Sequence, residues 1–86
     1  MSQFQKAVYK AVNRIPFGQT RSYQWVARKT GRPKAVRAIG EALKKNPFPF
    51  AIPCHRVIRK DKTLGGYILG KELKKKLLNW EKNILS

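Results

Sequence analysis

Proline and glycine interrupt the helical pattern of this chain at three points and so limit it to short helices. The breaks fall at residues 16–18 (Pro-Phe-Gly), 31–33 (Gly-Arg-Pro) and 46–49 (Asn-Pro-Phe-Pro). Each proline lacks the backbone donor that a helix needs, and it biases the preceding residue toward extended geometry. A chain of 86 residues divided in this way has room for one domain with one modest core.

The segments between the breaks carry apolar residues at helical spacing. We predict a first helix from its N-cap Ser2 to about Ile15, and a second, shorter helix that begins after the N-cap Ser22. A third helix begins at or just after Pro33 and runs to about Lys45. The second and third helices, joined by a short turn that contains glycine, form a helix-turn-helix pattern.

Short extended pieces and one more helix are predicted for the rest of the chain. Residues 50–52 and 57–58 are predicted to be extended on either side of the loop 53–56, and residues 64–67 form a loop. The last helix covers residues 71–83. Its predicted buried side carries Leu73, Leu77, Trp80 and Ile84, and its lysines lie elsewhere: Lys71, Lys74, Lys75 and Lys82. The prediction is a mostly α-helical small domain over residues 1–86, of the winged helix-turn-helix kind, with short extended segments around the loop 53–56.

The charge of the chain points to a polyanionic partner. Twenty lysines and arginines against four acids give a formal net charge of +16, far more than solubility requires. A nucleic acid is the first partner that this charge suggests. The alternative explanation of the charge is a lysine-rich proteome or an extreme habitat. On the third helix Val36, Ile39 and Leu43 face inward, and the outward side is mostly cationic. Gly40 in this helix is either a tolerated imperfection or a place where another chain segment or a ligand comes close.

The sequence carries no signal for a membrane or for export. No apolar run approaches membrane-spanning length, and the N-terminal residues lack the pattern of a signal peptide. We therefore expect a cytoplasmic protein, associated with the nucleoid if it binds DNA.

Cys54 and His55 are the one cysteine and the one histidine of the chain, and they are adjacent. They can form neither an internal disulfide nor a structural zinc site. Cys54 is either a small buried hydrophobe or a nucleophile, and His55 is either a hydrogen-bonded structural residue or a base. Neighbours in an extended segment point in opposite directions, so their direct contact requires a bend, a helical turn or a bridging water. Among the four acids, Glu81 is the attractive candidate to orient His55.

Three segments of the chain carry a family resemblance: residues 37–42 (Arg-Ala-Ile-Gly-Glu-Ala), residues 46–47 (Asn-Pro) and residues 52–58 (Ile-Pro-Cys-His-Arg-Val-Ile). They closely resemble the active-site signature of the O6-alkylguanine-DNA alkyltransferases, also called methylated-DNA-protein-cysteine methyltransferases. The agreement extends over nearly the whole chain, through Ser22-Tyr23 upstream and through Gly66-Tyr67 and Glu81 downstream. The resemblance is to the DNA-binding and active-site domain, because the family's additional N-terminal domain has no counterpart in this sequence.

The resemblance implies a stoichiometric transfer that needs no cofactor and no metal. Cys54 takes the alkyl group from guanine O6, and His55, held by Glu81, acts as the base through a water. Tyr67 assists the departing purine, and the backbone at Val57 and Ile68 contacts the base. Typical members carry small residues where this chain has Ile68 and Leu69, which implies a tighter pocket wall.

The resemblance also implies how double-stranded DNA is bound. The damaged nucleotide is flipped out of the duplex, with Arg37 filling the vacated stack and Tyr23 pushing on the neighbouring phosphate. Asn46 is the hinge between the third helix and the active-site loop. The protein acts as a monomer, and its third helix enters the minor groove. The other DNA-binding residues that we expect are the cations and small residues Arg21, Arg28, Lys29, Lys34, Lys44, Ala35, Ala38 and Gly40.

Two further interpretations stay open. One is a non-enzymatic, alkyltransferase-like protein that binds the lesion; such relatives typically carry tryptophan where this chain has Cys54. The other is a generic basic helix-turn-helix protein with an architectural or regulatory role, in which Cys54 is only buried.

Overall fold

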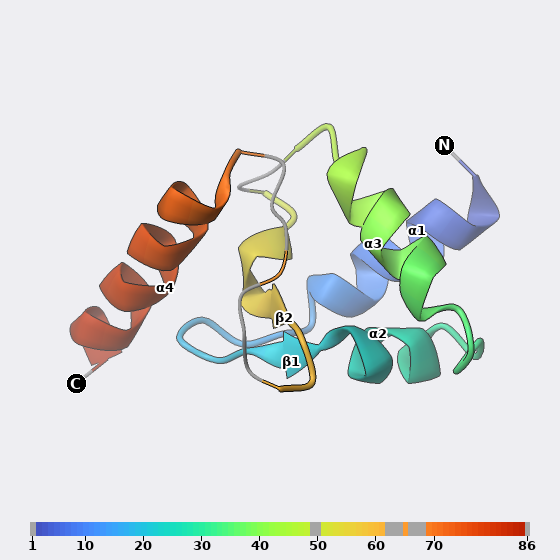
Figure 1. The fold of residues 1–86 in the computed structure, drawn as a ribbon, viewed down its shortest axis with the longest axis horizontal. Helices are drawn as coiled ribbons and strands as arrows, with labels where there is room; N and C mark the ends of the chain where they lie inside the picture. Colours follow the sequence, from blue (N-terminus) through green and yellow to red (C-terminus); the bar gives the residue numbers. More distant parts are fainter. Residues whose placement is uncertain (1, 49–50, 62–64, 66–68, 86) are drawn as a thin grey trace.

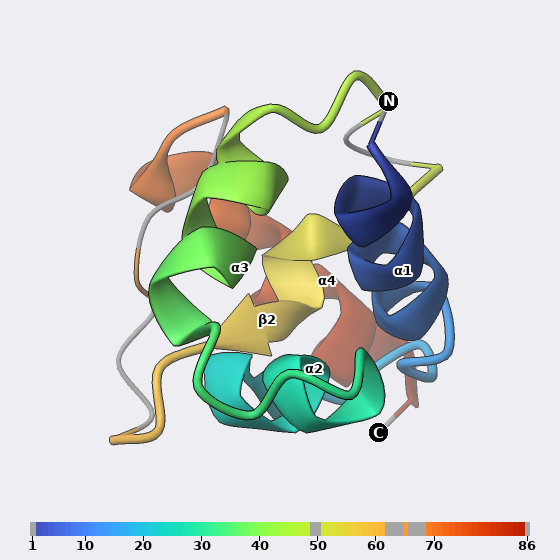
Figure 2. The same ribbon diagram turned by 90° about the vertical axis from the view of Figure 1, so that its right-hand side faces the viewer.

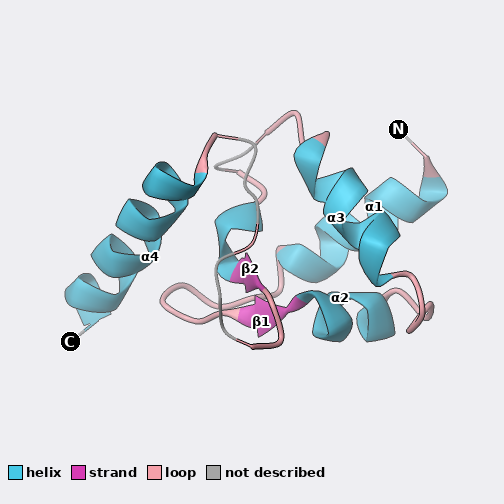
Figure 3. Ribbon diagram, viewed as in Figure 1, coloured by secondary structure: helices cyan, strands magenta, loops and turns pink. Residues whose placement is uncertain are grey.

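Four α-helices and a very short sheet make up the computed structural model, which describes residues 2–48, 51–61, 65 and 69–85. The helices are α1 (Gln3–Val12), α2 (Tyr23–Lys29), α3 (Val36–Lys44) and α4 (Lys71–Leu85). Between α3 and α4 lie a short 3₁₀ helix, η1 (Cys54–Arg56), and the strand β2 (Val57–Ile58), which pairs with β1 (Arg21–Ser22). The predicted mostly helical small domain is confirmed (Figure 3).

Local capping explains where the first two helices begin. The Ser2 hydroxyl accepts a hydrogen bond from the Gln5 N–H at 3.0 Å, and the Gln5 side chain in turn accepts one from the Ser2 N–H. The Ser22 hydroxyl accepts from the Trp25 N–H at 3.0 Å. Both predicted N-caps are confirmed. The first helix ends at Val12 and not at Ile15, because the N–H groups of Arg14 and Ile15 donate to carbonyls three residues back, in a tighter turn that leads into Pro16.

The helix-turn-helix is present as α2, the turn at residues 30–35 and α3. Gly31 in this turn has φ +79°, a conformation that residues with a side chain rarely adopt. The third helix begins at Val36, three residues later than Pro33, and it ends at Lys44. A wing would fall in the segment after β2, where residues 62–64 and 66–68 lie outside the described part of the chain.

The core lies where α1, α2 and α3 meet. Val8, Val12, Val26 and Ile39 are fully buried there, and Cys54 and Val57 belong to the same apolar cluster. Figures 1 and 2 show η1 and β2 between this group of helices and α4. Residues 54–58, the candidate active-site segment, are therefore packed on both sides, which holds their backbone in place.

The parallel pairing of β1 with β2 brings the start of α2 next to the active-site segment. Arg21 pairs with Val57 and Ser22 with Ile58, so Tyr23 begins its helix beside the end of β2. A parallel pair needs a crossover, and α2 and α3 supply it. The prediction that residues 57–58 are extended is confirmed.

The prediction of an extended segment at residues 50–52 is wrong for its described part. Residues 51–52 form a turn in which the Ile52 N–H donates to the Phe48 carbonyl at 2.8 Å. Phe50 lies outside the described residues. Among the described residues, no helix is both long and apolar enough to cross a membrane.

Candidate active site and groove

The η1 turn decides where the side chains of Cys54 and His55 point. The Cys54 N–H donates to the Ile52 carbonyl at 2.7 Å, and the Arg56 N–H donates to the Pro53 carbonyl at 3.0 Å. A 3₁₀ turn has about three residues per turn, so successive side chains diverge by about 120°. Cys54 accordingly faces Asn46 and His55 faces Glu81. The pair thus lies on a helical turn, and its two side chains contact different neighbours.

Cys54 is buried, and its nearest polar neighbour is a side chain amide. The Cys54 thiol is 3.3 Å from Asn46 Nδ2, which also donates to the Ile52 carbonyl at 3.1 Å. Asn46 Oδ1 accepts from the Phe48 N–H at 2.9 Å. Burial raises the pKa of the Cys54 thiol, although the Asn46 hydrogen bond and the charge of Lys74 act in the opposite direction. The resting thiol is therefore protonated near neutral pH, and a base is needed to activate it.

His55 is bonded to Glu81 inside the protein. His55 Nε2 lies 2.5 Å from Glu81 Oε2, and both side chains are almost fully buried. Burial alone would raise the pKa of Glu81, but hydrogen bonds from Arg56, His55 and the Gly18 N–H lower it. Because the carboxylate can only accept, Nε2 carries the proton and Nδ1 is the basic nitrogen. Burial lowers the pKa of His55 and outweighs the opposite effect of Glu81, so the imidazole is neutral near pH 7 and can accept a proton.

Arg56 is a residue of the candidate site that the sequence analysis did not single out. Its Nε donates to Glu81 Oε1 at 3.0 Å and its Nη2 donates to Oε2 at 3.1 Å, while Nη1 donates to the Ile15 carbonyl at 3.0 Å. The Gly18 N–H donates to the same Oε1 at 3.0 Å. Arg56 thus fixes the carboxylate that orients His55. Its place beside the Cys-His pair was the available signal, since a carboxylate buried under a histidine needs a cation.

Lys74 is buried, which contradicts the prediction that it lies with the outward lysines of the last helix. Its side chain is fully buried, and Nζ donates to the Val57 carbonyl at 2.7 Å. Burial lowers the pKa of Lys74 to about 8. The signal was in the sequence: Lys74 stands seven residues before Glu81, so both lie on one helix face. If Glu81 reaches His55, Lys74 must also face inward.

The predicted apolar side of the last helix is also wrong in part. Trp80 and Ile84 are 54% and 56% exposed, while Leu73 and Leu77 are half-buried. The helix is rotated so that Glu81 and Lys74 face the core, because both side chains bond to the active-site segment. Trp80 instead packs edge-on against Phe17, with ring centres 5.6 Å apart.

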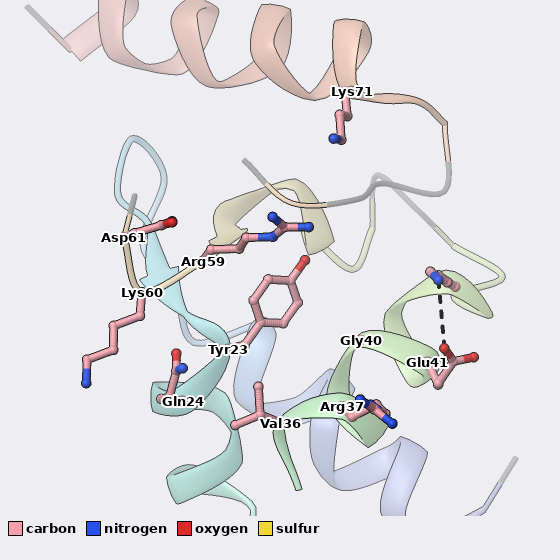
Figure 4. Close-up of a pocket in the computed structure, with 11 residues that line it drawn as sticks. Tyr23, Gln24, Val36, Arg37, Gly40, Glu41, Arg59, Lys60, Asp61 and Lys71 are labelled. Atoms are coloured by element: carbon pink, nitrogen blue, oxygen red, sulfur yellow. Dashed lines mark ion pairs between the residues drawn. The ribbon is translucent and has the colours of Figure 1, made fainter. Parts of the chain in front are cut away.

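A groove of about 900 Å³ opens between α3, the start of α2 and the segment after β2. Of the predicted DNA-binding residues, Tyr23, Arg37, Gly40 and Lys44 line it. Figure 4 shows Tyr23 between Arg37, on α3, and Arg59, beyond β2. A Cβ at Gly40 would meet nothing within 4 Å in the described chain, so close packing does not explain this glycine. Further cations line the groove that the sequence analysis did not assign: Arg59, Lys60 and Lys71.

The remaining predicted residues lie elsewhere. Arg21 donates to the Thr20 carbonyl and to Gln19, and Ala38 lines a second, smaller groove beside α1. Lys34 and Ala35 lie in the turn before α3, and the exposed Arg28 and Lys29 end α2. Val57 is buried, with its carbonyl bonded to Lys74 and its N–H to the Cys54 carbonyl. Tyr67 and Ile68 lie outside the described residues.

Comparison with known proteins points to one family. A family model described as 6-O-methylguanine DNA methyltransferase, DNA binding domain, matches residues 3–83. A methylated-DNA–protein-cysteine methyltransferase of Methanosarcina barkeri is 48% identical over 84 residues, which cover 98% of this chain and 53% of that protein. The chain spans about half the length of the curated relatives it matches.

Two of the solved structures that match most of this chain are complexes with DNA. Mycobacterium tuberculosis OGT in complex with DNA matches with a TM-score of 0.94 and 44% identity, over 96% of this chain and 51% of that one. S. pombe Atl1, in complex with damaged DNA containing O6-carboxymethylguanine, matches with a TM-score of 0.84 and 34% identity, over 94% of this chain and 77% of that one.

Proposed function

The chain belongs to the 6-O-methylguanine DNA methyltransferase family, and from this premise we propose that it repairs O6-alkylguanine in DNA by moving the alkyl group to Cys54. The observation that carries the proposal is the arrangement of three buried side chains: a thiol, an imidazole on the same turn, and a carboxylate bonded to that imidazole. The relative from Methanosarcina barkeri is named for this activity. Each protein molecule acts once, because the thioether that forms is not reversed.

The chemistry follows from the protonation states of the site. The thiol proton of Cys54 passes to His55 through a water, and the charged imidazole is stabilised by Glu81. The sulfur then bonds to the alkyl carbon, while the bond from that carbon to guanine O6 breaks and its electron pair stays on the purine. Tyr67 donates a proton to the purine, and the proton held by His55 restores Tyr67. The net products are an S-alkylcysteine and guanine.

DNA binding supplies the substrate to this site. The reactive carbon is inside the stacked duplex, so the nucleotide must leave the stack, at a cost of a few kcal/mol. Arg37 is exposed at the groove, where its side chain would fill the gap, and Tyr23 also lines this groove. Asn46 joins the end of α3 to the Cys54 loop through its bonds to Ile52 and Cys54, and these bonds support the predicted hinge role. We expect a monomer whose α3 enters the minor groove.

A transfer assay tests the proposal. The folded protein is incubated with a duplex that carries labelled O6-methylguanine, and the modified residue is located by mass spectrometry. We expect one label per protein molecule, on Cys54, and none on the Cys54→Ala variant. Folded protein that binds the duplex but takes up no label would contradict the transfer.

The similarity to S. pombe Atl1 supports a second candidate, a lesion-binding protein without transferase activity. This function predicts tight binding to O6-alkylguanine duplexes that is unchanged by Cys54→Ala, with no label on the protein. A generic helix-turn-helix protein predicts equal affinity for damaged and undamaged duplexes and a thiol that does not react with O6-benzylguanine.

A further inference from the structure

The groove contains a guanidinium group that the chemistry above does not use, that of Arg59. We propose that Arg59 binds a phosphate of the DNA backbone next to the flipped nucleotide and positions that nucleotide for Cys54. The inference rests on the proposed function, because it assumes that the groove receives DNA. Arg59, on the groove wall opposite Arg37, would then be a further contact to the DNA backbone.

The backbone fixes where Arg59 lies relative to the reactive thiol. Arg59 follows β2 directly, and β2 follows the η1 turn that begins at Cys54. The pairing of Ser22 with Ile58 holds this end of β2 against the start of α2. A ligand held by Arg59 therefore has a defined position relative to Cys54 and to Tyr23.

The side chain of Arg59 extends over the groove toward the hydroxyl end of Tyr23 (Figure 4). The two residues meet around Gly65, where an added Cβ would lie 2.9 Å from the Tyr23 hydroxyl and 3.5 Å from Arg59 Cγ. Arg59 itself is exposed, and within the described residues it has no ion pair with a carboxylate. Its guanidinium is thus open to a ligand.

The charge and the shape of the groove favour a phosphate group as its ligand over a carboxylate group. Arginine offers a planar pair of donors that matches two phosphate oxygens. Five cations from three parts of the chain line the groove, while its two acids are Asp61 and Glu41, the latter 3.7 Å from Lys44. The volume of about 900 Å³ is in the range of sites for ligands of nucleotide size. The aromatic ring of Tyr23 lies between Arg37 and Arg59 and offers a surface on which a sugar or a base could pack (Figure 4).

Arg59→Gln tests the contact, with Arg14→Gln as the matched control, because Arg14 is exposed and lies outside the groove lining. Affinity for an O6-methylguanine duplex is measured in the Cys54→Ala background, so that no transfer occurs. We expect Arg59→Gln to weaken binding about tenfold and to lower the slope of log K against log salt by about 1. With Cys54 present, the loss of rate with the duplex should exceed the loss with free O6-benzylguanine, which carries no phosphate. Arg14→Gln should change neither the affinity for the duplex nor the slope with salt, and it should affect the rates with duplex and with free base equally.

A second measurement assigns the phosphate. Each phosphate flanking the lesion is replaced in turn by an uncharged methylphosphonate. We expect one position at which the replacement weakens duplex binding by the protein that retains Arg59 about tenfold. At this position the replacement should cause no further loss of affinity in Arg59→Gln. Losses that add at every position, or equal losses with duplex and free base, would overturn the proposal. A coupled position in a protein that never labels Cys54 would reject the alkyl transfer and leave the Arg59 contact standing.

Discussion

The protonation of His55 can be followed in NMR spectra as a single imidazole signal, because it is the one histidine of the chain. Burial lowers its pKa, and the Glu81 carboxylate 2.5 Å from Nε2 acts in the opposite direction. We therefore expect Glu81→Gln to lower the pKa of His55 further, because the stabilising negative charge is lost. An NMR titration of the imidazole measures this shift directly, and the transfer rate should fall with it.

Glu72→Gln is the control for this change, since Glu72 is exposed on the same helix. It should leave the imidazole titration where it is. A rise of the His55 pKa in Glu81→Gln would mean that the carboxylate does not stabilise the charged imidazole, and the orienting role of Glu81 would be wrong.

Lys74 gives a pH dependence of stability whose sign is defined. The pKa falls from 10.5 to about 8 on folding, so between these values the unfolded chain binds a proton that the folded chain does not. Stability from this group must therefore rise with pH across that window. We expect the free energy of unfolding of the natural protein, relative to Lys74→Met, to increase by on the order of 3 kcal/mol from pH 8 to pH 10.5. Urea unfolding at a series of pH values measures it.

The comparison between the two proteins removes the titration of the other groups, which both share. Lys75→Met, at the exposed neighbouring position, is the control and should follow the natural protein in parallel. Parallel curves for Lys74→Met as well would show that Lys74 keeps its ordinary pKa in the folded chain.

At the scale of elements, the end of α3 and the η1 turn are joined by one amide, that of Asn46. Its three hydrogen bonds connect residues 48, 52 and 54. We expect Asn46→Ala to raise the pKa of Cys54, because the hydrogen bond to the sulfur that lowers it is lost. It should also reduce stability by about 1–3 kcal/mol, since buried backbone groups lose their partner. The thiolate absorbance as a function of pH, with Cys54→Ala subtracted, reports the first effect, and urea unfolding reports the second.

Asn79→Ala is the matched control, because Asn79 is exposed on α4. A thiol pKa that stays the same or falls in Asn46→Ala would show that the amide does not bond to the sulfur.

The elements that the sequence predicted well are those whose signals are local. Ser2 and Ser22 cap helices through residues three positions away, so a short stretch of chain contains both partners. The β1–β2 pair depends on contacts between residues more than thirty positions apart, such as Arg21 with Val57, and no local pattern encodes it.

The last helix shows why the candidate site was only partly predictable. Apolar spacing placed Trp80 and Ile84 inside and Lys74 outside, yet the helix turns the other way to bond Glu81 to His55 and Lys74 to Val57. Polar contacts here outweigh apolar periodicity. Arg56 was overlooked for the same reason, since its role depends on a carboxylate from a distant helix.

At the scale of the whole molecule, little of the positive charge is balanced within the chain. One of the four acids, Glu81, is buried and bonded to Arg56, and another, Glu41, pairs with Lys44. Most of the net charge of +16 is therefore available to attract a polyanion from a distance. Cations from α3, the segment after β2 and the start of α4 line the groove, so an attracted polyanion can bind there.

This distribution predicts how strongly salt weakens binding to undamaged duplex DNA. If the five groove cations, Arg37, Lys44, Arg59, Lys60 and Lys71, each neutralise one phosphate, the slope of log K against log salt should be about −4.5. Fluorescence anisotropy with a labelled duplex over a series of salt concentrations measures this slope.

Replacing Lys60 and Lys71 by glutamine should reduce the magnitude of the slope by about 2, whereas replacing Lys6 and Lys10, exposed on α1 outside the groove, should leave it unchanged. Equal reductions in the two double variants would mean that the duplex is held by the overall charge of the protein and that the groove has no special part in binding.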